Sequence, residues 1–136
     1  MRIVLDTNVF VSGIFFSGPP SRILEAWRDG KIELAISPDI LSEYQRVGNE
    51  LSKQFPSVDL SSILGLVTIH AMMFQSPQLS EPVCEDPDDD MFIACAIASK
   101  SKVIVSGDKH LLKVADFGGV TILKPREFVD TYLVKS

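Results

Sequence analysis

Long apolar runs and paired cysteines are both missing from this chain of 136 residues, and each absence excludes a class of protein. No apolar stretch reaches the roughly 20 residues that a membrane-spanning helix requires. The two cysteines, Cys84 and Cys95, lack the spacing of metal-binding pairs, and we expect free thiols in a reducing cytoplasm. The first residues lead directly into strand-like sequence, so we expect a cytoplasmic protein without a signal peptide and without a membrane partner.

Common ligand-binding motifs are absent as well. The glycine spacings of a P-loop and of a dinucleotide-binding loop do not occur. An EF-hand loop counted from Asp86 has Met91 where glycine is required and Ile97 where the last glutamate belongs. Aromatic and basic residues do not alternate as they do in proteins that stack nucleic-acid bases.

The negative charge, in contrast, is abundant and local. The chain has 18 acids and 13 bases, a formal net charge of −5 at pH 7. Residues 81–90 hold six of the acids and no base, so the remainder is close to neutral. Bound divalent cations would reverse the sign of that segment, and the net charge therefore does not exclude a nucleic-acid partner.

Strand-like and helix-like segments alternate along the chain. The strand-like segments are continuously apolar, which is typical of a parallel sheet covered on both faces. We predict one domain over residues 1–136, an α/β fold with a three-layer α/β/α sandwich and a parallel sheet of four or five strands. The expected strands are 2–6, 32–36, 102–107 and 120–123, and the expected helices are 7–16, 21–30, 38–53, 59–75, 91–100, 108–115 and 125–133.

Four separate segments can bring acids to one edge of this sheet. Asp6 and Asp108 follow strands, and ligands of such folds bind beyond the carboxyl ends of the strands. The aspartates at 88–90 begin a helix whose amino end points to the same edge. Glu43 lies in line with apolar residues three positions before it and four after it, a side of the helix that faces the protein.

Each acid also has an ordinary structural explanation, as a helix cap, a charge at a helix start or a good helix former. Capping explains neither three adjacent aspartates nor a glutamate on the apolar side of a helix. Crowded carboxylates resist shared ionisation unless a cation is present, and ligands that are all oxygen favour Mg²⁺ or Mn²⁺. Such a site suits phosphoester hydrolysis, with one carboxylate free to orient or deprotonate the attacking water.

The chain resembles the PIN-domain nucleases, in particular the branch of toxin components of toxin–antitoxin pairs. The segments that carry the resemblance are "IVLDTNVFVSG", "SPDILSEYQRV", "DPDDDMFIACAIA" and "VIVSGDKHLL", which occur in the family's order and at about its spacing. The resemblance covers nearly the whole chain. It implies an α/β/α sandwich that binds Mg²⁺ or Mn²⁺ and cleaves RNA, usually single-stranded, a homodimer or higher oligomer, and a protein antitoxin as partner.

The resemblance also implies which acids form the site. Carried over by position, the catalytic and metal-binding acids are Asp6, Glu43, Asp90 and Asp108, with Asp89 as the second choice for the third position.

Several other residues are expected to support these acids. Asn8 and Ser106 match polar positions beside them and would hold water or orient carboxylates, whereas Asp86 and Asp88 are interpreted as charges at a helix start. Basic residues that flank the acidic segments are candidates for contacts with RNA phosphates: Arg46, Lys109 and Lys113, together with Lys100 and Lys102.

Two other functions remain open at this point. An aspartyl-phosphate phosphatase would use Asp6 as its nucleophile, but it usually needs a second aspartate where this chain has Asn8. A non-catalytic metal-binding interaction module would carry the same acids. Independently, the segment 64–74 is apolar on all sides as a helix, so we expect it to pack, with part of 21–27, against a second subunit or an antitoxin.

Overall fold

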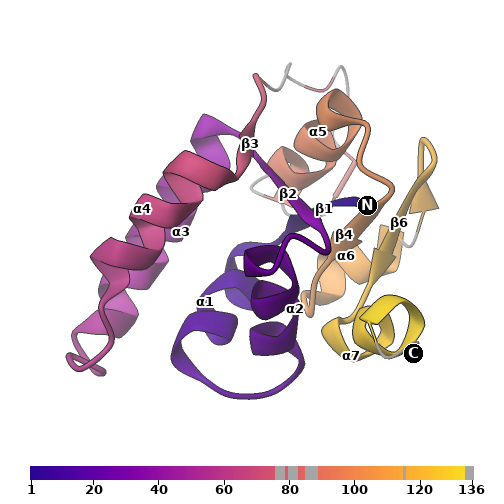
Figure 1. The fold of residues 1–136 in the computed structure, drawn as a ribbon. Helices are drawn as coiled ribbons and strands as arrows, with labels where there is room; N and C mark the ends of the chain where they lie inside the picture. Colours follow the sequence, from indigo (N-terminus) through magenta and orange to yellow (C-terminus); the bar gives the residue numbers. More distant parts are fainter. Residues whose placement is uncertain (76–78, 80–82, 85–88, 115, 134–136) are drawn as a thin grey trace.

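A six-stranded sheet lies at the centre of the computed structural model, which describes residues 1–75, 79, 83–84, 89–114 and 116–133 (Figure 1). Five strands are parallel, and β5 runs antiparallel to β6. The predicted α/β architecture is confirmed, and the predicted parallel sheet of four or five strands corresponds to the five parallel strands, to which β5 adds an antiparallel edge strand. In spatial order the strands are β3 (Met72–Met73), β2 (Glu33–Ile36), β1 (Arg2–Leu5), β4 (Val103–Val105), β6 (Val120–Leu123) and β5 (Asp116–Phe117).

The two strands that the sequence analysis missed are the short edge strands. The predicted helix over 59–75 is wrong at its end, because the helix stops at His70 and Ala71 is extended. Residues 72–73 then pair with β2, and the amide of Phe74 donates to the carbonyl of Ile36 at 2.8 Å. Strand β5 forms a hairpin with β6 through two glycines at 118–119, both with positive φ.

The helices begin where side-chain caps or prolines predict. Asp6, Ser37 and Asp59 accept hydrogen bonds from the first-turn amides of α1, α3 and α4. The predicted C-terminal helix is two elements, because α7 widens into the π-helix η2. The bounds are α1 (Thr7–Phe15), α2 (Pro19–Arg28), α3 (Pro38–Ser52), α4 (Leu60–His70), α5 (Asp90–Ser99), α6 (Lys109–Val114), α7 (Pro125–Phe128) and η2 (Val129–Leu133).

The helices cover the sheet in layers. Helix α5 packs across β1, β2, β4 and β6, while α1 and α2 lie on the other side of the strands, and α3 and α4 run side by side at one flank (Figure 1). The central strands are buried on both faces, with Ile3, Val4 and Leu5 no more than 1% exposed. Burial of each such side chain contributes roughly 1.5–3 kcal/mol. Among the described residues, no helix combines the length and apolar character that crossing a membrane requires.

Candidate active site

The ends of β1 and β4 bring two distant parts of the chain together. These strands are adjacent and parallel, with Leu5 paired to Val105. The pairing continues past the strand ends, because the amide of Asp6 donates to the carbonyl of Val105 at 3.1 Å. Residues 6 and 106 therefore lie side by side at the carboxyl edge of the sheet, which is where the sequence analysis expected the acids to meet.

Asp6 is a buried acid with two sets of hydrogen bonds. Its side chain is 3% exposed. Oδ1 accepts from the amide of Val9 at 2.8 Å, which caps α1, and Oδ2 accepts from the hydroxyl of Ser106. The structural explanation for Asp6 thus holds, but capping occupies only one of the two oxygens. The other oxygen connects Asp6 to the loop after β4.

Ser106 links Asp6 to Asp108. The Ser106 hydroxyl donates to Asp6, and Oγ accepts from the amide of Asp108 at 2.9 Å. Oδ1 of Asp108 in turn accepts from the amide of His110 at 2.7 Å, at the start of α6. A single buried hydroxyl therefore sets the distance between two acid-bearing loops.

The pKa of Asp6 is raised above its ordinary value. Burial is the largest cause, because a charged carboxylate loses its hydration. The hydrogen bonds from Ser106 and Val9 lower the pKa, the negative charge of Asp108 raises it, and the amide of Gly107 lowers it again. The net result is a carboxylate whose ionisation is opposed by its surroundings, and a nearby cation would relieve that opposition.

The start of α5 contributes a third acidic segment. Asp89 is the N-cap residue and Asp90 is the first residue of the helix. The carboxylate of Asp90 accepts from the amides of Val83, at 3.2 and 3.3 Å, and Cys84, at 2.8 Å. Asp90, the preferred third acid, therefore connects the preceding loop to the start of α5 through hydrogen bonds. The sequence analysis did not predict this structural role.

The pKa of the Cys84 thiol indicates that these acids lie close together. Burial, the hydrogen bond with Asp90 and the charges of Asp90, Asp89 and Asp108 raise the pKa of its thiol to about 12. Asp108 acts on the same thiol as the two acids of α5, so the loop after β4 and the start of α5 share one electrostatic environment. Both cysteines are free and buried, as predicted.

Glu43 comes to this side of the protein on α3 but pairs with a base. The Arg46 guanidinium donates from Nε to Oε1 at 3.1 Å and from Nη2 to Oε2 at 2.9 Å. The adjacent Tyr44 fixes this turn of α3, since its hydroxyl donates to the carbonyl of Leu5 at 2.6 Å. Glu43 therefore precedes the residue that fixes α3 to the end of β1, next to Asp6. Its carboxylate forms an ion pair with Arg46.

The donor chemistry of these residues fits a divalent cation, although their arrangement is not that of a complete metal site. The acids offer only carboxylate oxygens, which Mg²⁺ and Mn²⁺ prefer, and the raised pKa of Asp6 shows an uncompensated cost of negative charge. Within the described ranges, however, no three His, Cys, Asp or Glu side chains are grouped so that they could hold a metal ion. Glu43 and Asp90 are engaged by Arg46 and by backbone amides.

The remaining predicted residues are spread more widely. Asn8, Lys109 and Lys113 are exposed, the first beside Asp6 and the others on α6. Lys100 and Lys102 precede β4 and line a pocket of about 400 Å³ at the opposite edge of the sheet from the acids. The structure therefore places these lysines away from the acids, and their role as phosphate contacts stays a prediction. Asp86 and Asp88 lie outside the described residues.

Tyr44 is the residue at this edge that the sequence analysis missed. It is fully buried and its ring stacks on Phe10, with centroids 4.0 Å apart. Its position four residues after Ile40 is the one available sequence signal, and it indicates a core residue. No local pattern could indicate that its hydroxyl reaches a strand 39 residues away in the sequence.

Comparison with known proteins finds a family model, a relative in sequence and a similar fold. A family model described as PIN domain matches residues 2–110. An uncharacterised protein of Methanocaldococcus jannaschii, MJ1680, is 30% identical over 145 residues, covering 97% of this chain and 92% of the relative. The crystal structure of FitAcB from Neisseria gonorrhoeae has a similar fold, with a TM-score of 0.55 and 19% identity, over 91% of this chain and 98% of that chain.

Proposed function

Because the chain belongs to the PIN-domain family, whose members are generally nucleases, we propose that it is a metal-dependent ribonuclease that hydrolyses phosphodiester bonds of single-stranded RNA. The observation that carries this proposal is the contact between Asp6 and Ser106, which lie 100 residues apart and bring Asp108 beside Asp6. Local capping requires only an acid near its own helix. It does not require two acid-bearing loops to be joined by a buried hydroxyl.

The residues at this edge have separate tasks in the proposed reaction. Mg²⁺ or Mn²⁺, when bound, would neutralise charge on the phosphate and lower the pKa of a bound water. Ser106 orients Oδ2 of Asp6 and fixes the loop that carries Asp108. Asp89 or Asp90 supplies the third carboxylate from α5, and Glu43 supplies the fourth from α3. Lys109 and Lys113 on α6 are candidates to bind the RNA backbone.

A cleavage assay tests the proposal directly. Purified protein is incubated with single-stranded RNA in Mn²⁺, in Mg²⁺ and in EDTA, and cleavage is expected only with the metals. Equal cleavage in EDTA would contradict a metal-dependent reaction. An acid-stable, alkali-labile phosphoryl group on Asp6 would instead support the phosphatase. Binding of metal and RNA without any cleavage would indicate a non-catalytic module.

Substitutions in the third acidic segment are expected to separate a catalytic acid from a structural one. Asp90→Asn should lower cleavage more than Asp88→Asn does. It should also lower the melting temperature, because an amide replaces one of the oxygens that accept from Val83 and Cys84. Asp89→Asn should lower cleavage more than Asp88→Asn only if Asp89, and not Asp90, is the third acid. Initial rates and melting curves of the three variants decide the order. If Asp90→Asn melts early but cleaves RNA at the normal rate, Asp89 is the third acid.

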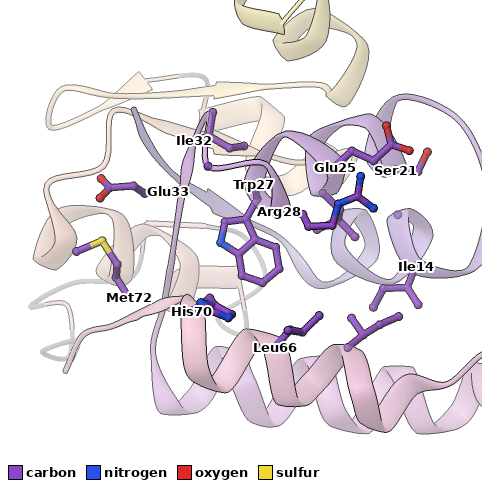
Figure 2. A pocket seen from close by; sticks show the side chains of 14 residues that line it. Ile14, Ser21, Glu25, Trp27, Arg28, Ile32, Glu33, Leu66, His70 and Met72 are labelled. Carbon is purple, nitrogen blue, oxygen red and sulfur yellow. The ribbon is translucent and has the colours of Figure 1, made fainter.

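We further propose that the protein is the toxin of a toxin–antitoxin pair and that an antitoxin occupies the groove between α2 and α4. This groove, of about 600 Å³, lies away from the acids, and Trp27 and Leu66 line it from opposite helices (Figure 2). Its other lining is largely apolar, with Ile14, Leu24, Ile63 and Met72. The similarity in fold to the FitAcB structure supports a protein partner for this chain.

The outer face of α4 is the expected contact between two copies of the chain. Ile69 on this helix is 74% exposed and does not line the groove. Residues 60–70 include no Asp, Glu, Lys or Arg, so a twofold contact through α4 would place no like charges opposite each other. Light scattering at tens of micromolar should show a dimer, and Ile69→Glu should convert it to a monomer. A monomeric unmodified protein would exclude self-association through α4, and Met73→Glu, on β3, is the control outside the helix.

A further inference from the structure

The following inference depends on the metal-dependent nuclease proposed above. We propose that Arg46 is a positioning residue, which holds the Glu43 carboxylate away from the metal. A phosphate of the substrate then replaces Glu43 at the Arg46 guanidinium. The guanidinium engages both oxygens of Glu43 in a fork, at 3.1 and 2.9 Å. Such a fork fits a phosphate equally well, because both anions present paired oxygens to the same donors.

The geometry confines this exchange to the side chains. Tyr44, next to Glu43, is fully buried and bonded to the carbonyl of Leu5, so this turn of α3 is fixed against the end of β1. The side chain of Glu43 is 30% exposed and that of Arg46 is 65% exposed. Arg46 can therefore leave Glu43 without any change in the backbone, and it is the more accessible partner for an incoming anion.

The strength of the ion pair suits a reversible switch. Ion pairs three residues apart on an exposed helix face are weak, and a divalent cation or a phosphodiester can compete with them. While the pair persists, Glu43 is engaged by Arg46 and would not be available as a metal ligand. When Arg46 moves to a phosphate, Glu43 becomes available, so substrate binding and metal binding strengthen each other. This coupling is reciprocal by thermodynamic necessity.

The proposal predicts that the affinity for Mn²⁺ rises when the basic side chain of Arg46 is removed. The affinity for Mn²⁺ is measured by electron paramagnetic resonance on metal-free protein, without RNA, for the unmodified chain and for Arg46→Gln. We expect Arg46→Gln to bind Mn²⁺ about two- to fivefold more tightly, since no pair has to be broken. Arg46→Lys, which keeps the charge but cannot form the fork, should give part of that increase. The affinity for single-stranded RNA in EDTA should fall in Arg46→Gln.

A double-mutant cycle distinguishes the pair from a general effect of charge. In a Glu43→Gln background, Arg46→Gln should no longer tighten Mn²⁺ binding, whereas loss of a nearby positive charge alone would tighten it in both backgrounds. Lys53→Gln, at the end of α3, serves as the matched loss of charge outside the pair, and it should leave the coupling between residues 43 and 46 unchanged.

Two results would overturn the inference. One is an equal or weaker affinity for Mn²⁺ in Arg46→Gln than in the unmodified chain, including no binding by either. The other is a tightening that persists undiminished in the Glu43→Gln background. The outcome is separable from the proposed function, because a chain that cleaves no RNA but shows the expected cycle has the Arg46 restraint without the ribonuclease activity.

Discussion

Asp6→Asn is expected to remove RNA cleavage while the protein stays folded. Asparagine keeps an oxygen at the position that accepts from the amide of Val9, and it caps helices as well as aspartate does, so α1 should still begin at Thr7. The lost negative charge removes a metal ligand, and the rate should fall by more than the ~10–100-fold typical of residues that only support a ligand. Initial rates in Mn²⁺ measure the effect, with Asp130→Asn, an exposed acid on η2, as the control variant prepared in parallel.

The same variant should be at least as stable as the unmodified protein when metal is absent. The pKa of Asp6 is raised in the folded state, so between the ordinary value of 3.8 and this raised value the folded protein holds more protons than the unfolded one. Stability therefore decreases as the pH rises through that window, and above the raised pKa the full cost of an ionised Asp6 is present. Asp6→Asn removes this cost, and its advantage should disappear as the pH falls toward 3.8.

Melting curves in EDTA across this pH range provide the measurement. Mg²⁺ should then raise the melting temperature of the unmodified protein and not that of Asp6→Asn, because only the former gains a bound ligand. Asp6→Ala is the matched control, since it removes the charge and also the cap, which costs about 1 kcal/mol. A metal-free Asp6→Asn variant that melts well below the unmodified protein would show that Asp6 serves mainly as a structural cap.

The sequence predicted the parallel sheet and most helix starts because those features depend on local patterns. Continuous apolar runs such as 103–105 specify strands that are buried on both faces, and Ser37 followed by Pro38 specifies the start of α3. The short edge strands escaped prediction because their pairing depends on distant residues. Met72 and Met73 continue an apolar run of helical type, but their pairing with β2, which includes the hydrogen bond from the amide of Phe74 to the carbonyl of Ile36, holds that segment extended.

The same difference between local patterns and contacts with distant residues applies to the candidate site. The meeting of Asp6 with Asp108 follows from strand order, since Asp6 comes directly after β1 and Asp108 comes three residues after the end of β4, the adjacent parallel strand. The partners of Glu43 and Asp90 do not follow from it. Arg46 lies three residues after Glu43, a spacing that permits an ion pair but also permits both side chains to face elsewhere. The amides that bind Asp90 belong to a loop whose path no periodic pattern describes.

Tyr44→Ala is expected to cause the largest loss of stability among the residues at this edge. The ring is fully buried and stacks on Phe10 at 4.0 Å, and truncation of a buried aromatic side chain typically costs about 3–5 kcal/mol. Tyr44→Phe keeps the ring and removes only the hydroxyl that donates to the carbonyl of Leu5 at 2.6 Å. That change should cost less, about 1–3 kcal/mol for a buried acceptor that loses its donor. Urea unfolding of both variants gives the two free energies.

The comparison of these two variants also tests whether the hydroxyl of Tyr44 matters for the site. If it holds α3 in register with β1, Tyr44→Phe should weaken Mn²⁺ binding while the stacked ring keeps the protein folded, because Glu43 is the next residue along the same turn. A Tyr44→Phe variant with reduced stability but unchanged affinity for Mn²⁺ would restrict Tyr44 to the core. The measurement requires no RNA, so it stands whether or not the ribonuclease activity is found. Temperatures well below the melting point of the variant keep unfolded protein out of the metal titration.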